Sequence, residues 1–305
     1  MKNKKKILIV GCGNMGTAHL TSFLKAKSKY DITVIDKISI INKLRSKFYY
    51  NFLKFQDKLP KNLIFDLVII ATGSKERFLI SNKIISNNSV RIVLLEKFIF
   101  QNKNDYLKFD ALLKLKKTKC YVNCWGSSLS RLLKFPKMIN KKTVVNIIIN
   151  KGDYLTNLIH ILNLVFEGTD FKKIDNHKLS IDKVFKSKVK NYQEVLGKLS
   201  FNTMDKNVYY NILSKPIQNI FEVKIKNKKQ SIIYLNNKLK LIKKNKNKIE
   251  KFNFPLSSLF TEKIYKNINN KKYPYKFIDY KYGKYLSLLI LNLISKSSTK
   301  ILSIR

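Results

Sequence analysis

Three glycines near the N-terminus, Gly11, Gly13 and Gly16, have the spacing G-x-G-x-x-G. They follow an apolar run at residues 7–10, which predicts a buried strand turning into a helix. In such a turn the first glycine permits the tight bend, and the second lets the backbone approach a pyrophosphate. The third lets the helix pack closely on the sheet. The phosphates would lie at the helix N-terminus, where unpaired N–H groups and the helix dipole favour an anion.

Asp36 ends a second apolar run, and it lies about twenty residues after the last glycine, where an acid can hydrogen-bond the hydroxyl groups of an adenosine ribose. Its charge repels a 2′-phosphate, which favours NAD over NADP. The neighbouring cation, Lys37, could offset part of that repulsion. Strand, turn, helix and acid together predict a dinucleotide-binding segment, and the alternative is a glycine-rich turn that binds nothing.

Strands and helices alternate through the first part of the chain. The pattern predicts strands at 48–52, 65–72, 91–95 and 120–123, and helices at 38–47, 75–86 and 104–116. Largely apolar strands are typical of a parallel sheet that is buried on both faces. The alternation therefore predicts a doubly wound, Rossmann-type α/β domain over residues 1–124, with ligands at the C-terminal ends of the strands.

From Trp125 onward the pattern changes. It predicts strands at 144–149, 220–225, 230–235 and 239–242, and helices at 128–138, 154–166, 257–267 and 285–295. The last three strands indicate an antiparallel meander, and the lysine-rich stretch 243–251 indicates a solvated loop. We therefore expect residues 125–305 to form an α+β domain with an open, largely antiparallel sheet.

The chain is strongly basic, with 62 Lys and Arg residues against 19 Asp and Glu residues and a formal charge of +43. A basic surface attracts phosphate backbones. The lysines, however, run through every segment beside many Asn and Ile residues, which share A/T-rich codons with lysine. We therefore expect no specific recognition of nucleic acid, whereas binding of anionic ligands and weak, nonspecific binding of polyanions stay open.

No apolar run reaches the roughly eighteen residues that a membrane-spanning helix needs. The apolar run at the N-terminus is too short for a signal peptide. The three cysteines, Cys12, Cys120 and Cys124, lack the C-x-x-C spacing and suit a reducing compartment. We expect a cytoplasmic protein with buried thiols, no membrane association and no metal site.

Several motifs in the order of the chain resemble those of Gfo/Idh/MocA-type oxidoreductases, in particular a branch found in surface-polysaccharide and sugar-nucleotide biosynthesis. Beyond the glycine turn they are Ala71-Thr72-Gly73-Ser74 with Arg77, Glu96-Lys97, Val122-Asn123-Cys124, Gly152, Asn157-Leu158-Ile159-His160 with Leu162, and Ser258-Leu259-Phe260-Thr261. The resemblance implies an NAD(P)-binding Rossmann domain and a C-terminal domain whose open sheet forms one wall of the active site. It also implies a homo-oligomer assembled through that sheet.

The resemblance assigns two catalytic residues. Lys97 matches a family lysine near the nicotinamide ribose and the reacting sugar hydroxyl, and a lysine at the mouth of a buried strand needs a polar or anionic partner. His160 matches a histidine on the first helix of the second domain, and imidazole can accept a hydroxyl proton near neutral pH. The predicted substrate residues are Asn157, Asn123 and Arg77. The predicted cofactor residues are Gly11, Gly13, Asn14, Met15, Gly16, Asp36, Thr72, Ser74, Glu96 and Lys97.

The chain departs from the family pattern at three places. Phe98 replaces a proline after the lysine, and Asn163 replaces an aspartate three residues after the histidine, which removes a charge that could orient the imidazole. The segment 275–283 supplies mostly Tyr and Lys where the family often has acids and a histidine.

These features predict an NAD-dependent oxidoreductase that acts on a carbinol or ketone of a sugar or sugar nucleotide. Two alternatives stay open: a reductase of a non-sugar substrate, and a catalytically degraded NAD-binding protein that acts as a regulator or assembly partner.

Overall fold

The structure of the chain is a computed structural model. It describes residues 4–24, 26, 29–139, 143–167, 174–187, 189–203, 208–217, 221–225, 230–235, 238–243, 248–253, 256–297 and 303–304. For residues 174–176, 230–235, 238–243 and 248–253 it describes the backbone only.

The chain folds into two compact units. The first comprises Met1–Cys124 and Leu256–Ser287, and the second comprises Trp125–Pro255 and Leu288–Arg305. The change of unit after Cys124 coincides with the change of sequence pattern, whereas the sequence division leaves residues 256–287 in the second domain. These residues return to the first unit because they pair with it: β17 (Ile278–Asp279) adds an antiparallel edge strand to β8, and Tyr30 donates a hydrogen bond to Glu262 over 2.9 Å.

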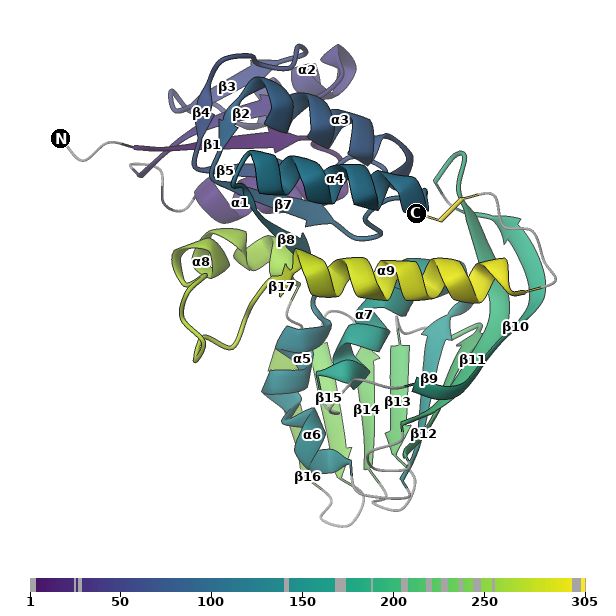
Figure 1. Cartoon of the computed structure of the whole chain (residues 1–305). Coiled ribbons are helices and arrows are strands. Elements are labelled where there is room, and N and C mark those ends of the chain that lie inside the picture. The colour runs from purple at the N-terminus through teal and green to yellow at the C-terminus, as the bar shows by residue number, and fades with distance from the viewer. Residues whose placement is uncertain are drawn as a thin grey trace. The chain divides into compact units, whose positions relative to one another are not determined.

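A seven-stranded sheet organises the first unit (Figure 1). Its order is β17-β8-β7-β5-β1-β2-β3, with β1 (Lys5–Val10), β2 (Tyr30–Ile35), β3 (Leu53–Gln56), β5 (Leu67–Ile70), β7 (Ile92–Glu96) and β8 (Lys119–Asn123) parallel. The connecting helices are α1 (Asn14–Leu24), α2 (Ile38–Lys47), α3 (Ser74–Asn87) and α4 (Lys103–Leu115), and a short parallel pair joins β4 (Ile64–Phe65) to β6 (Ser89–Val90). The predicted Rossmann fold is confirmed. The strand order reverses between β1 and β5, which is where such sheets bind ligands.

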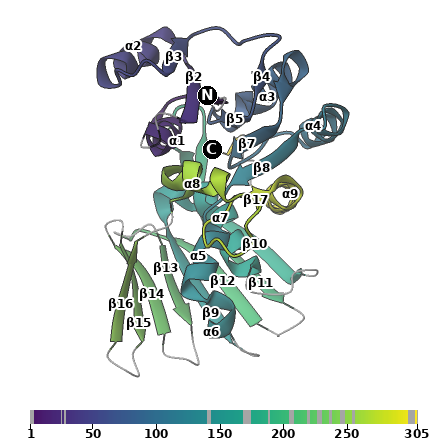
Figure 2. The ribbon, with the colours of Figure 1, turned by 90° about the vertical axis from the view of Figure 1, so that its left-hand side faces the viewer.

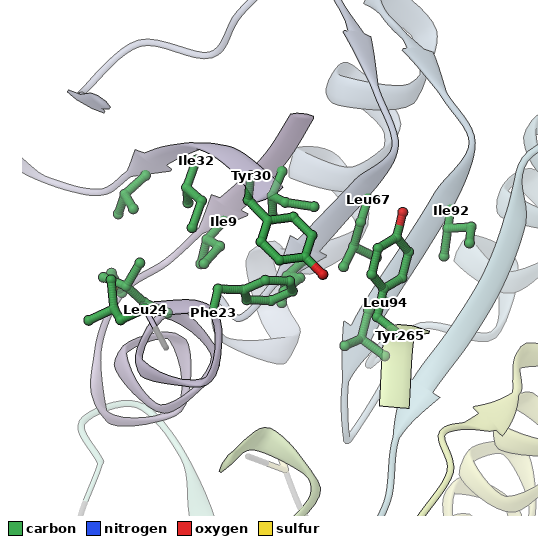
Figure 3. Close-up of a cluster of buried hydrophobic side chains, with 14 of the residues drawn as sticks. Ile9, Phe23, Leu24, Tyr30, Ile32, Leu67, Ile92, Leu94 and Tyr265 are labelled. Atoms are coloured by element: carbon green, nitrogen blue, oxygen red, sulfur yellow. The ribbon is translucent and has the colours of Figure 1, made fainter. Parts of the chain in front are cut away.

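A hydrophobic core packs α1 against the strands of this sheet (Figure 3). Phe23 on α1 meets Tyr30 edge-on, with ring centroids 5.0 Å apart, and both are buried. Tyr265, on α8 (Thr261–Lys266), belongs to the same cluster, near Leu67 and Leu94. Each fully buried apolar side chain of this size contributes about 2–3 kcal/mol. The late segment and the helix after the glycine turn therefore share one core.

An eight-stranded sheet organises the second unit (Figure 2). Its order is β10-β11-β12-β9-β13-β14-β15-β16, with β9 (Val144–Asn150), β10 (Ile174–Lys186), β11 (Gln193–Thr203), β12 (Val208–Lys215), β13 (Phe221–Ile225), β14 (Gln230–Leu235), β15 (Lys238–Lys243) and β16 (Lys248–Asn253). All neighbouring pairs are antiparallel except β12 with β9. The predicted antiparallel sheet is confirmed.

Helices α5 (Gly126–Leu133), α6 (Phe135–Met138) and α7 (Tyr154–Phe166) accompany this sheet, and the short 3-10 turn η2 (Lys151–Asp153) leads into α7. In β9 the alternate residues Val145, Ile147 and Ile149 are fully buried, as expected for a strand with one face toward the core. The long helix α9 (Tyr280–Ser295) runs across the division between the units.

Several predicted elements differ from the observed ones. The strand expected at 48–52 is displaced to β3. The helix expected at 128–138 is divided at Lys134, whose φ of 52° is left-handed and ends α5. The loop expected at 243–251 includes part of β16, whose residues 248–253 pair with β15; residues 244–247 lie outside the described residues.

The helix predicted at 257–267 begins with a 3-10 turn, η4 (Ser257–Phe260), before α8. The strands β10, β11 and β12 were not predicted, because their many polar residues obscure the alternation of apolar and polar positions that is typical of a strand. Within the described residues, no helix is both long enough and apolar enough to cross a membrane.

Candidate functional site

The glycine turn between β1 and α1 has the geometry of a phosphate cradle. Gly11 has a φ of 83°, and a Cβ there would lie 2.9 Å from the backbone nitrogen of Thr72. A Cβ on Gly16 would lie 1.9 Å from the Gly11 carbonyl oxygen, so helix and turn touch directly. A Cβ on Gly13 meets nothing within 4 Å. Gly11 and Gly16 are therefore needed for close packing. Gly13 borders open space, in which a ligand can approach the backbone of the turn.

Helix α1 begins at Asn14 and has no acidic residue in its first turn. Its first N–H groups lack intrahelical partners, and the positive end of the helix dipole lies there. Asn14, Met15 and the turn therefore suit an anion such as a pyrophosphate.

Asp36, at the end of β2, contacts the turn. One carboxylate oxygen accepts a hydrogen bond from the backbone N–H of Cys12 over 2.5 Å, and the other accepts from the N–H of Lys37 over 2.7 Å. An ionised carboxylate has about four acceptor positions, so two stay available for ribose hydroxyls. Burial raises the pKa of the Cys12 thiol to about 11, so the cysteine in the turn is an inert core residue.

Thr72 lies in the loop after β5, and Ser74 is the first residue of α3. The Thr72 hydroxyl oxygen is buried without a hydrogen-bond partner among the described residues. The Ser74 hydroxyl accepts a hydrogen bond from the side chain of Gln101 over 2.6 Å. An unpaired buried polar atom costs about 1–3 kcal/mol, and a bound ligand could relieve it. The glycines, Asp36 and Thr72 thus fit a dinucleotide.

Arg77 lies on α3 and is buried, with 3% of its surface exposed. Its guanidinium donates hydrogen bonds to the backbone carbonyls of Thr72, Phe98 and Ile99. It therefore ties the loop after β5 to the loop after β7. A contact of Arg77 with substrate stays a prediction.

Glu96, the last residue of β7, is the centre of a buried polar network. Its Oε1 atom accepts hydrogen bonds from His19 Nε2 over 2.8 Å and from Asn123 Nδ2 over 2.6 Å. On the other side of the imidazole, His19 Nδ1 lies 2.6 Å from the hydroxyl of Thr261. Because a carboxylate only accepts, Nε2 of His19 carries the proton of that hydrogen bond.

This network holds Glu96 ionised. Burial raises its pKa, but the hydrogen bond and charge of His19, the hydrogen bond of Asn123 and the charge of Lys97 outweigh burial, so the pKa lies below the ordinary 4.5. The Oδ1 atom of Asn123 is buried and makes no hydrogen bond within the described part of the chain. No binding or catalytic role was expected for His19; its position three residues after Gly16 is the only signal in the sequence.

Lys97 follows Glu96 at the strand end and is half-buried. The peptide bond between Lys97 and Phe98 is cis. The side chain of Phe98 is buried, so this aromatic residue enters the core where the resemblance expects a proline.

His160 and Asn157 lie on α7 in the second unit, and Lys97 lies in the first. Asn157 is the one residue of α7 that is not fully buried. The imidazole of His160 stacks on the indole of Trp125, with ring centroids 4.5 Å apart and planes at 28°. No site role was expected for Trp125.

Asn163, which stands where the family has an aspartate, caps α5. Its Oδ1 atom accepts from the backbone N–H of Ser127 over 2.6 Å, and its Nδ2 donates to the Ser127 hydroxyl over 2.8 Å. The amide therefore fastens α5 to α7.

Glu194, on β11, is a buried carboxylate that sequence reasoning missed. It accepts hydrogen bonds from the backbone N–H groups of Leu155 and Thr156 at the start of α7, over 2.7 and 3.1 Å. Burial raises its pKa to about 7 against these hydrogen bonds, and the charge of Asp153 adds to the rise. It caps the helix that carries Asn157 and His160.

Comparison with known proteins agrees with this geometry. Residues 5–124 match the model of the Gfo/Idh/MocA oxidoreductase family, which describes an NAD-binding Rossmann fold. Among curated protein sequences, none matches the chain.

Solved structures match nearly the whole chain. UDP-N-acetylglucosamine 3-dehydrogenase from Acidithiobacillus ferrooxidans is 11% identical, with a TM-score of 0.71 over 95% of this chain and 97% of that one. A super-repressor mutant of Gal80p from Saccharomyces cerevisiae is 12% identical, with a TM-score of 0.70 over 96% and 95%. Biliverdin reductase from Synechocystis, solved with biliverdin and NADP+, is 13% identical, with a TM-score of 0.66 over 96% and 99%. At these identities the likeness concerns the fold.

Three features agree with the family match. They are the open turn at Gly13, the carboxylate of Asp36 beside it, and the reversal of strand order between β1 and β5. Residues 5–124 are therefore similar to the NAD-binding Rossmann fold of the Gfo/Idh/MocA oxidoreductase family.

Proposed function

We propose that the chain is an NAD-dependent oxidoreductase that transfers a hydride to or from a carbinol or ketone of a sugar or sugar nucleotide, in surface-polysaccharide biosynthesis. The observation that carries the proposal is the turn at Gly13, whose open side lies beside Asp36 and the N-terminus of α1. When bound there, the dinucleotide supplies the hydride donor or acceptor. Asp36 would bind its ribose hydroxyls and favour NAD over NADP.

The proposed roles of the other residues follow from their chemistry. A ring nitrogen of His160 would exchange a proton with the reacting hydroxyl, since imidazole titrates near neutral pH. Lys97 would donate a hydrogen bond from Nζ to the reacting oxygen, and Asn157 would orient the substrate. Asn123 has an unpaired buried acceptor to offer, and Glu96, held ionised beside Lys97, would favour the charged lysine.

Two features support the class of substrate. The similar dehydrogenase from Acidithiobacillus ferrooxidans acts on UDP-N-acetylglucosamine. The formal charge of +43 suits an anionic, nucleotide-linked sugar. We further propose that the chain forms a homo-oligomer through the sheet of its second unit.

The experiment that tests the proposal is a calorimetric titration of the purified protein with NADH and NADPH, followed by mass spectrometry of any nucleotide or sugar that co-purifies. We expect binding with a preference for NADH, and a retained sugar nucleotide would identify the substrate. Failure to bind either dinucleotide would remove the cofactor role of the turn.

A second candidate is an NAD-binding regulator without turnover. Asn163 favours it, because its amide caps α5 and supplies no charge toward His160. The similar Gal80p structure is described as a super-repressor. This candidate predicts tight NADH binding and no hydride transfer to any sugar nucleotide, whereas a non-sugar reductase, as in the similar biliverdin reductase, predicts turnover that ignores sugars.

A further inference from the structure

Trp125 and His160 form a stacked pair in the second unit. Their ring centroids are 4.5 Å apart with planes at 28°, and each residue is 5% exposed. Trp125 also stacks on Phe221 of β13, with centroids 5.6 Å apart and planes at 15°. Since stacked rings in a packed core have few alternative arrangements, the indole occupies a defined position against the imidazole.

The first residues of α5 contact α7 one after another, and these contacts hold the Trp125 ring against the His160 ring. Trp125 is the N-cap of α5, and the next residue is Gly126. A Cβ on Gly126 would lie 2.2 Å from the carbonyl oxygen of His160 itself, so only glycine permits this approach. Ser127 then bonds to Asn163, one turn of α7 beyond the histidine.

We propose that Trp125 is a positioning residue for His160: its indole face holds the imidazole in one plane and thereby fixes the direction of the two ring nitrogens. The torsion that turns an imidazole about its bond to Cβ is intrinsically broad, so a flat neighbour is an effective restraint. A protonated imidazole on an indole face gains about 0.5–2 kcal/mol from the cation–π contact. This inference rests on the proposed function, in which His160 moves the substrate proton.

Other charged groups lie at the two ends of α7, and their titration must be distinguished from that of His160. Glu194 caps the N-terminal end, near Asp153, and Glu167 at the C-terminal end binds the guanidinium of Arg131 over 3.3 Å. Of these, Glu194 has a pKa of about 7 and would titrate in the same range as an imidazole. The Glu194→Gln variant removes that contribution.

The first experiment needs no substrate. Trp125 is the only tryptophan of the chain and His160 is one of three histidines, so both have separable signals. We expect tryptophan emission to fall as pH drops through the imidazole range in wild type and in Glu194→Gln, because a protonated imidazole quenches a stacked indole. In His160→Gln the pH-dependent step should be absent. An unchanged step in His160→Gln would overturn the proposal.

Nitrogen NMR of the histidines then tests positioning. Trp125→Phe keeps a flat ring and should leave the His160 resonances close to wild type, whereas Trp125→Leu should shift and broaden them. Phe166→Leu is the matched control, since Phe166 is a buried aromatic on the same helix that packs on Phe201. Wild-type His160 resonances in a folded Trp125→Leu protein would contradict the proposal, whether or not the protein turns over a substrate.

Kinetics separate positioning from packing. With an active substrate, Trp125→Leu should lower kcat at least tenfold and displace its pH profile while leaving KM for NADH within about twofold. Trp125→Phe should restore most of kcat. Loss of kcat by the same factor in Trp125→Phe, Trp125→Leu and Phe166→Leu would indicate packing alone. A wild-type protein that binds NADH and shows the stack but transfers no hydride would instead contradict the proposed function.

Discussion

The Nε2 atom of His19 lies 2.8 Å from Oε1 of Glu96, and both side chains are buried. The pair joins α1, which follows the glycine turn, to the strand end that carries Lys97. Removing one partner of such a buried pair leaves an uncompensated group and costs about 3–5 kcal/mol.

We therefore expect His19→Ala to lower the free energy of unfolding by about 3 kcal/mol or more. Urea unfolding followed by circular dichroism measures this loss. The matched control is His177→Ala, since His177 is exposed and its removal should cost less than about 0.5 kcal/mol. Equal stability of the two variants would mean that the buried pair contributes nothing.

The glycines of the turn should separate folding from cofactor binding. Gly13→Ala places its methyl group in open space, so the fold should persist while NADH affinity falls at least about tenfold, or 1.4 kcal/mol. Gly16→Ala places a methyl group 1.9 Å from the Gly11 oxygen and should lower the melting temperature. Calorimetric titration and thermal unfolding compare the two variants. NADH binding by Gly13→Ala at wild-type strength would contradict the assignment of the phosphate site.

The charge of Asp36 should determine the choice between NADH and NADPH. Asp36→Asn keeps an oxygen that can accept from Cys12 but removes the negative charge, so the ratio of NADPH to NADH affinity should rise by about tenfold. Parallel titrations with both dinucleotides measure the ratio. An unchanged ratio would show that Asp36 does not discriminate between them.

The buried carboxyl of Glu194 should make stability fall as pH rises from about 4.5 to about 7. Its folded pKa is above its unfolded value, so in this window the native state binds the proton more tightly and loses that advantage as pH increases. The full effect is on the order of 3 kcal/mol and is complete above pH 7. Denaturant unfolding across this range should show a flatter profile for Glu194→Gln than for wild type. Identical slopes would remove Glu194 as the cause.

Local patterns predicted much of the first unit. The turn at Gly11, the helix α2 and the strand ends at Asp36 and Glu96 follow from short runs of residues whose periodicity is undisturbed. The return of residues 256–287 to this unit depends on contacts that span more than two hundred residues, such as Tyr30 with Glu262, and no local pattern encodes them.

The site was predicted less completely than the fold. Asn157 and His160 were predicted from the resemblance to a known family, and their roles stay predictions. The stack of Trp125 on His160 joins two helices and depends on the missing side chain of Gly126, so no local pattern indicates it. Likewise Glu194 lies on a strand that the sequence did not reveal, so its capping of α7 became visible only in three dimensions.

The most direct test of the central claim is deuteride transfer from 4-deuterated NADH to keto forms of UDP-linked sugars, read by mass spectrometry of the product. We expect wild type to place deuterium on one sugar carbon, and Lys97→Met and His160→Gln to bind NADH normally but transfer at least a hundredfold more slowly. NADH binding by wild type without deuterium in any sugar would contradict the proposed reaction, and wild-type rates in either variant would remove that residue from it.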